Sequence, residues 1–269
     1  MKKILLALAT AALLAACATT ISPTGRTQYV GAVPQEQLDQ LGAQAFVEMK
    51  GSQKLSTDRS QNAYVNCVVQ AVVRELPAEQ RAIAWEAAVF ADDSPNAFAL
   101  PGGKVGVNTG ILRVARDQDQ LAAVIAHEIG HVIARHHDER ITRQYGAAGA
   151  LQVVGGLLGA RYGEGVGQAA MQGGSIAAQG LFLLPGSRAQ ETEADVVGQE
   201  LMARAGFDPR KAVDLWQNMI AASGGNRPPE WLSTHPNPQS RISEMQARAA
   251  ALVPVYEQAR ASGRRPACR

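Results

Sequence analysis

Four of the five histidines in this 269-residue chain lie between positions 127 and 137. His127 and His131 are four residues apart, and on a helix of about 100° per residue this spacing places both side chains on one face. Two imidazoles on one helix face can bind the same metal ion. Glu128 projects beside them, about 100° further round the helix, where its carboxylate can contact a water molecule on that ion. The pattern therefore predicts a metal site with a general base next to it.

The spacing H-E-x-x-H is the one that zinc proteases use, and a catalytic zinc usually has three protein ligands and one open position. His137 is one candidate for the third ligand, because it follows His127 by ten residues, as in metzincins. That pattern requires a glycine turn where this chain has Ala134, and alanine does not readily adopt left-handed conformations. If the helix instead continues, His137 faces away from the metal, so we disfavour it.

Glu191 is the better candidate for the third ligand. It lies in a predicted helix, and Asp195, four residues on, shares its face. Glu191 can bind the metal while Asp195 accepts the other N–H of a ligating imidazole. Glu193 lies about 200° from Glu191 on the same helix and is expected to be solvated.

Three motifs in this order resemble one family of zinc metallopeptidases: "HEIGHVIARH", "SRAQETEAD" and "STHPNPQSRI". That family includes the CAAX prenyl endopeptidase, the membrane heat-shock protease HtpX and bacterial outer-membrane lipoprotein proteases. The resemblance implies one zinc ion, with Glu191 as its third ligand and Asp195 in support. It also implies an α+β, mostly helical, zincin-like domain. Because the sequence has no counterpart of the transmembrane helices of the integral-membrane members, it is most similar to the lipoprotein branch.

The predicted reaction is hydrolysis of a peptide bond. Zinc lowers the pKa of its bound water towards about 7 and polarises the scissile carbonyl. Glu128 takes the proton of the water and returns it to the leaving amine. His235, in "THPNP", either donates to the developing oxyanion or occupies the open position on zinc and makes the enzyme latent; the alternative is an ordinary loop residue. Arg241 is expected to position this loop or to form a surface ion pair.

The helices that must hold these residues are indicated by their end signals. Asp117 is the expected N-cap of the histidine helix, with Gln120 completing a capping box. Gly206 is expected to end the helix that carries Glu191. Further helices are predicted at 35–50, 57–76, 209–223 and 238–252.

A small antiparallel sheet is expected beside the histidine helix. The stretches "AWEAAVFAD" and "NAFALPGGKVGVNTG" predict three short strands, the last two joined at 101–103. Related zinc proteases carry at this place an edge strand that pairs with an extended substrate. The residues concerned are Asn96, Ala97, Phe98 and Ala99, and a plain structural strand is the alternative.

The N-terminal residues indicate export. Two lysines precede an apolar run that is too short to span a membrane, which is typical of a secretory signal. "LAAC" resembles the bacterial lipobox, so Cys17 is expected to be lipidated; the alternative is an ordinary signal with an incidental cysteine. Ala18 favours the outer membrane. The expected division is a signal at 1–16, a lipidated cysteine and tether at 17–34, and a peptidase domain at 35–269.

Composition excludes little beyond nucleic-acid binding. The two signal lysines account for the formal net charge of +2, so the remaining chain is neutral and no basic patch indicates nucleic acid. If lipidation uses Cys17, Cys67 and Cys268 are left as a possible disulfide, or as one buried and one loose thiol. The Gly- and Ala-rich segment 146–180 can be a lid, a membrane-surface hairpin or two loosely packed helices.

These features predict a zinc metalloendopeptidase that is lipid-anchored on the periplasmic face of the outer membrane. Its expected substrates are unfolded or misassembled envelope proteins, as in protein quality control. The alternative is a latent or noncatalytic lipoprotein that acts as a chaperone or assembly factor for outer-membrane proteins. Glu128 favours the enzyme, because a pure binding module has no need of a base.

Overall fold

The computed structural model describes residues 19–144, 186–222, 235 and 239–269. These residues belong to two compact units. The larger unit contains residues 38–136 and the described residues from 186 onward, and the smaller unit contains residues 19–37 and 137–144. All the predicted metal ligands therefore belong to the larger unit.

The histidine helix, α6, runs from Gln118 to Ile133. Asp117 is its N-cap, as predicted, and accepts a hydrogen bond from Gln120 N at 2.8 Å. The return bond differs from that of a capping box, because Gln120 Oε1 accepts from Arg116 N at 2.9 Å. Every residue from Gln120 to His131 is buried. A helix that is buried all round holds its ligands in the protein interior.

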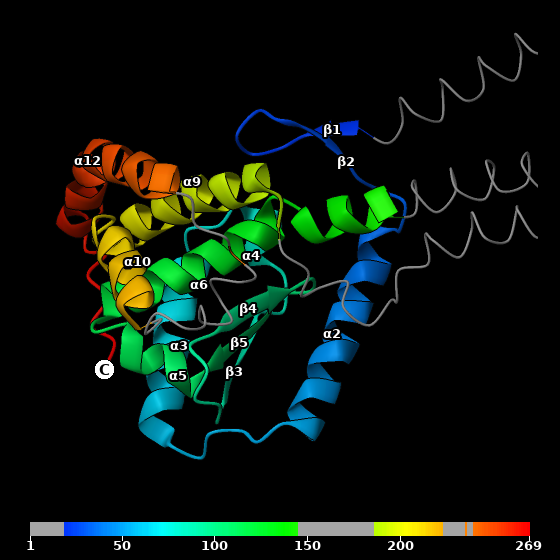
Figure 1. Ribbon diagram of the computed structural model, residues 1–269, viewed down its shortest axis with the longest axis horizontal. Helices are drawn as coiled ribbons and strands as arrows, with labels where there is room; N and C mark the ends of the chain where they lie inside the picture. Colours follow the sequence, from blue (N-terminus) through cyan, green and yellow to red (C-terminus); the bar gives the residue numbers. More distant parts are fainter. Residues whose placement is uncertain (1–18, 145–185, 223–234, 236–238) are drawn as a thin grey trace, which may run out of the picture. The chain divides into compact units, whose positions relative to one another are not determined.

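Helix α9, Arg188–Ala205, packs along α6 (Figure 1). It begins with a complete capping box between Ser187 and Gln190. It ends as predicted at Gly206, which adopts the left-handed conformation with φ 84°. Both ends of the second ligand-bearing helix are thus set by local sequence signals.

The small sheet consists of β3 (Glu86–Phe90), β4 (Ala97–Leu100) and β5 (Lys104–Asn108), in the order β3-β5-β4. Strands β4 and β5 are antiparallel, whereas β3 is parallel to β5, so the sheet is mixed and not wholly antiparallel as expected. The sequence of a strand does not show whether the neighbouring strand runs parallel or antiparallel to it. Helix α6 packs against β4, which places the sheet beside the histidine helix (Figure 1). The predicted α+β, mostly helical class is confirmed.

The other named helices are α2 (Gln35–Ser52), α3 (Arg59–Val73), α4 (Ala78–Arg81), α5 (Thr109–Val114), α10 (Lys211–Ala222) and α12 (Gln239–Ala261). Of these, α3 and α10 pack against α6, and α12 packs against α9 and α10. Helix α12 passes the predicted end at 252 with Pro254 inside it, because packing of a helix can outweigh one lost backbone hydrogen bond.

The smaller unit contains a hairpin within the segment expected to be a tether. Strands β1 (Thr19–Ile21) and β2 (Thr27–Tyr29) pair antiparallel. Arg26, in their connection, donates to both oxygens of the buried Glu139 at 2.7 and 2.8 Å, and Arg143 donates to the same carboxylate at 2.6 Å. This distant carboxylate is a partner that the local composition of 17–34 does not reveal.

Three predicted features lie outside the described residues. These are the signal 1–16, the lipidated Cys17 and the segment 146–180. In the part of the chain that the structure describes, no helix combines the length and apolar character that a bilayer crossing requires.

Candidate metal centre

Four side chains of the larger unit converge in a potential metal site. His127 and His131 come from α6, Glu191 comes from α9, and His235 lies between the two helices α10 and α12 in the sequence. One donor atom from each of the four lies within 4.8 Å of the others. The three ligands predicted from the sequence are therefore brought together, and His235 joins them.

Two glycines allow the ligand-bearing helices to approach closely. A Cβ atom on Gly198 of α9 would lie 2.9 Å from the backbone nitrogen of His127. A Cβ atom on Gly130 of α6 would lie 3.0 Å from the carbonyl oxygen of Ala194. Both neighbours are backbone atoms, so the distance between α6 and α9 depends on the absence of these side chains.

Glu191 is the observation that best fits a metal ion. Its side chain is fully buried, and neither carboxylate oxygen accepts a hydrogen bond within the described residues. Its nearest charged or ring nitrogens are on His127, His131 and Arg241, at 3.4, 3.6 and 3.4 Å. A buried carboxylate without hydrogen bonds is costly unless a cation satisfies it. Two imidazole nitrogens and a carboxylate oxygen are the donor set of a catalytic zinc site.

The electrostatics of His127 also favour a cation here. Burial by itself lowers the pKa of His127, but the nearby carboxylates of Asp195 and Glu191 raise that pKa to about 10. Burial likewise raises the pKa of Glu191, and the neighbouring His127 and Arg241 bring it below its usual value. The two carboxylates thus stabilise a positive charge at the cluster, whether it is carried by a proton or by a metal.

Asp195 lies beside His127, where the prediction placed it. Its Oδ1 lies 3.0 Å from His127 Nδ1, which leaves Nε2 of that ring to face the cluster. Arg241 donates to both oxygens of Asp195 at 2.8 and 2.9 Å and stacks over Trp216 at 4.7 Å. Arg241 is buried, so it is not the surface ion pair considered above. Arg241 contacts both carboxylate oxygens of Asp195, including the Oδ1 atom that lies beside His127.

Glu128 and His235 face each other beside the ligands. His235 Nε2 lies 3.4 Å from Glu128 Oε1, and its ring centroid is 5.1 Å from that of His127 and 5.4 Å from that of His131. Burial lowers the pKa of His235, although Glu128 and Glu191 act in the opposite direction. A neutral imidazole in this place can donate a hydrogen bond to a reacting group or ligate the metal.

Two site residues were missed by the sequence analysis. Glu193, expected to be solvated, is 2% exposed, and its Oε2 lies 3.1 Å from His136 Nε2. His136 Nδ1 in turn lies 2.8 Å from His131 Nδ1. The adjacent pair His136–His137 after the zinc motif was the available signal, but only His137 was weighed as a ligand.

The end of α6 explains why the prediction failed there. The helix stops at Ile133, and Arg135 has φ 53°, so the chain turns in the left-handed conformation one residue after Ala134. The assumption that the helix continues through Ala134 was therefore wrong. His137 is nevertheless not part of the cluster found among the described residues, in agreement with the prediction.

The predicted substrate strand is an edge strand. Ala97, Phe98 and Ala99 belong to β4, and Asn96 precedes it. Strand β4 pairs with β5 on one side only, considering the strands that the structure describes. Its side chains are nearly fully buried, with Phe98 the most exposed at 9%. Recognition at this strand would therefore use its backbone, and its pairing with a substrate stays a prediction.

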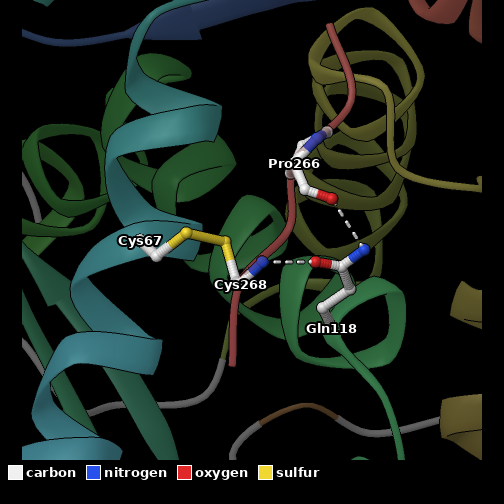
Figure 2. Close-up of a disulfide and its surroundings, with 4 residues drawn as sticks. All are labelled: Cys67, Gln118, Pro266 and Cys268. Carbon is white, nitrogen blue, oxygen red and sulfur yellow. Dashed lines mark hydrogen bonds between the residues drawn. A yellow bond between two sulfur atoms is a disulfide. The ribbon is translucent and has the colours of Figure 1, made fainter.

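Cys67 and Cys268 form a disulfide that joins α3 to the C-terminal segment (Figure 2). Next to it, Gln118, the first residue of α6, accepts a hydrogen bond from Cys268 N at 2.9 Å and donates to Pro266 O at 3.0 Å. The segment 266–268 is thus fastened both to α3 and to the start of the histidine helix.

The buried helix pair, the edge strand and the His/Glu cluster define a metallopeptidase domain of the zincin type. Residues 59–249 match the model of Peptidase family M48, and the chain belongs to that family. The family predicted from the three motifs is confirmed at this level. Zinc is the metal of this family, and the cluster of His127, His131, Glu191 and His235 fits it.

Similar proteins come from mitochondria and bacteria. The mitochondrial metalloendopeptidase OMA1 of Schizosaccharomyces pombe is 41% identical over 170 residues, covering 60% of this chain and 46% of the relative. The beta-barrel assembly-enhancing protease of Escherichia coli K12 is 31% identical over 222 residues, covering 81% and 45%. The metalloendopeptidase OMA1 of Danio rerio is 31% identical over 224 residues, covering 78% and 45%. The chain spans about half the length of these curated relatives.

Proposed function

We propose that this protein is a zinc metalloendopeptidase, lipid-anchored at the outer membrane through Cys17, that cleaves unfolded or misassembled envelope proteins. The observation that carries the enzymatic part is the position of Glu128. A buried carboxylate stands directly beside a complete set of metal donors, 3.4 Å from His235. A purely structural metal site needs no such group.

The residues of the site divide the reaction between them. When bound by His127, His131 and Glu191, zinc makes water nucleophilic near neutral pH and polarises a carbonyl group. Glu128 accepts the proton of the attacking water and passes it to the leaving amine. His235 Nε2 donates a hydrogen bond to the developing oxyanion. Asp195 holds the ring of His127 in place throughout.

The substrate class is argued from β4 and from one relative. Backbone pairing along an edge strand selects extended, unfolded chain over particular side chains. The name of the Escherichia coli relative associates that protein with β-barrel assembly. Both points support misassembled envelope proteins as substrates.

The membrane anchor is argued from the N-terminal sequence. The apolar run ends in the lipobox-like "LAAC", and multiple acyl chains on one cysteine give stable membrane attachment. We expect wild type to fractionate with outer membranes and Cys17→Ser to be released into the soluble periplasmic fraction. A Cys17→Ser protein that fractionates as wild type does would contradict the anchor.

A second candidate function is a latent lipoprotein that binds folding outer-membrane proteins without cleaving them. It is favoured by one observation, the inclusion of His235 in the donor cluster. With His235 as a fourth ligand, no position is left for water.

The deciding experiment compares Glu128→Gln with wild type on an unfolded test protein. We expect Glu128→Gln to bind zinc and fold normally but to lose proteolysis, because only proton transfer is removed. His131→Ala should lose both activity and zinc. The control is Glu48→Gln, which changes an exposed glutamate of α2 and should be as active as wild type. Wild-type activity in zinc-bound Glu128→Gln would refute the mechanism.

The same variant identifies substrates. In cells, an inactive enzyme retains chains that the active enzyme degrades, so Glu128→Gln should capture envelope proteins that are absent from a wild-type capture. Equal capture by the two proteins would favour the noncatalytic binding function.

A further inference from the structure

We infer that His136 and Glu193 are positioning residues that fix the proton on His131 Nδ1 and thereby present His131 Nε2 to the metal. The inference deepens the proposed function and rests on the same metal site. Neither residue touches the reacting atoms. They act through His131, one of the two histidine ligands from α6.

The three side chains form a continuous buried chain. His131 Nδ1 and His136 Nδ1 are 2.8 Å apart, and His136 Nε2 and Glu193 Oε2 are 3.1 Å apart. His131, His136 and Glu193 are 4%, 0% and 2% exposed. Bulk water therefore does not compete for these hydrogen bonds, and their direction is set within the protein.

Only one donor-to-acceptor direction along these hydrogen bonds is compatible with metal binding by His131. An ionised Glu193 can only accept, so His136 Nε2 carries the proton. The Nδ1 atom of a neutral His136 is then an acceptor, and it requires a donor on His131 Nδ1. A neutral His131 that is protonated on Nδ1 has its lone pair on Nε2. That atom faces the donor cluster, 3.1 Å from His127 Nε2.

The opposite direction would block the site. If Glu193 donated to His136, every proton in the chain would move one place, and His131 Nε2 would carry a hydrogen towards the metal. A nitrogen that carries a hydrogen has no lone pair for a metal. The donor-to-acceptor direction of the hydrogen bonds therefore decides whether His131 presents a lone pair on Nε2 to the metal.

The arrangement also gives both histidine ligands an equivalent support. His127 Nδ1 contacts a carboxylate of α9 directly, through Asp195 at 3.0 Å. His131 reaches a carboxylate of the same helix through one intervening ring, that of His136. The chain turns in the left-handed conformation at Arg135, just after the end of α6. His136 follows this turn and lies between His131 and Glu193.

The first test measures zinc affinity by competition with a chelator, which does not depend on proteolysis. Asn and Leu have nearly the same shape, but only Asn offers an acceptor near the place of His136 Nδ1. We expect His136→Leu to weaken zinc binding by about 10- to 100-fold, and His136→Asn to remain within a few fold of wild type. Glu193→Gln should weaken binding by about tenfold, while the matched control Glu200→Gln, on an exposed site of α9, should not change it.

The second test reads the protons directly in the wild-type zinc protein. Nitrogen-15 spectra of the histidine rings should show His136 protonated on Nε2 alone and His131 protonated on Nδ1. Protonation of His136 on Nδ1, or equal zinc affinities for His136→Leu and His136→Asn, would overturn the inference. A failure of the proposed proteolysis leaves these outcomes unaffected, because none of them is read from peptide cleavage.

Discussion

Asp195 connects two side chains at the metal site, those of His127 and Arg241. It contacts His127 Nδ1 and receives both hydrogen bonds of Arg241. Burial raises the pKa of Asp195, but the hydrogen bonds from His127 and Arg241 outweigh it and lower that pKa below its usual value. Asp195 is therefore ionised at neutral pH, and it orients His127 for metal binding.

His235 allows a sharp prediction at the scale of one residue. If its Nε2 stabilises the oxyanion, His235→Ala should lower turnover by roughly a hundredfold or more with little change in substrate binding. If it instead ligates the metal in a latent state, the variant should bind a zinc-directed inhibitor faster than wild type. Steady-state kinetics and rapid-mixing inhibition separate the two. A variant that matches wild type in both would make His235 an ordinary loop residue.

Residues whose roles depend on helical spacing could be predicted from the sequence. The pairs His127–His131 and Glu191–Asp195 are each four apart, and the structure brings all four together. Glu193 could not be predicted in this way. Its position on an isolated helix, about 200° from Glu191, indicates a solvent-exposed side chain. In the structure it contacts His136, which is placed there by the turn at Arg135 after the end of α6.

The spacing of helices α6 and α9 is fixed by close contact between their backbones. At Gly198 an added Cβ would meet the His127 nitrogen at 2.9 Å and its Cα at 3.0 Å. These atoms belong to the same residue that supplies a metal ligand. A change in the spacing of the two helices is thus transmitted directly to the site.

We expect Gly198→Ala to destabilise the protein by about 1–3 kcal/mol, because an overpacked helix contact outweighs the better helix propensity of alanine. Zinc affinity should fall as well. The matched control is Gly51→Ala in α2, where an added Cβ meets nothing within 4 Å and should be neutral or slightly stabilising. Urea unfolding and chelator competition measure the two effects. Equal stability of the two variants would contradict the close-contact argument.

The sequence predicts where these helices begin and end better than it predicts which strands pair and in which direction. Asp117 caps the start of α6 with its side chain, and Gly206 ends α9 in the left-handed conformation, both where expected. The parallel pairing of β3 with β5 carries no such signal, since it is decided by how the connections cross in three dimensions.

On the scale of the whole larger unit, the disulfide joins segments that are far apart in the sequence. Cys67 and Cys268 are 201 residues apart, with a Cα–Cα distance of 5.5 Å (Figure 2). Sequence reasoning reached this pair by elimination among three cysteines. It could not place Pro266 and Cys268 against Gln118, because that contact depends on the packing of the whole unit.

Removing the disulfide should destabilise the protein. Closing a loop of this length contributes about 5 kcal/mol in the chain-entropy model, and measured values are often smaller. We expect the double variant Cys67→Ser/Cys268→Ser to unfold at lower urea than wild type, and wild type in reductant to behave like the variant. Reductant should not affect the variant itself. Peptide mapping that finds two free thiols in the mature protein would contradict the pairing.

The hold of residues 266–268 on Gln118 has a consequence for the order of events during synthesis. The first turn of the zinc helix leaves the ribosome about 150 residues before Cys268, the residue whose backbone binds it. A growing chain therefore carries the complete H-E-x-x-H sequence long before its helix is fastened at the N-terminal end. Glu191 and His235 are also made later than the zinc motif. The metal centre and its contact at the start of α6 can therefore be completed only when nearly all of these 269 residues have been made.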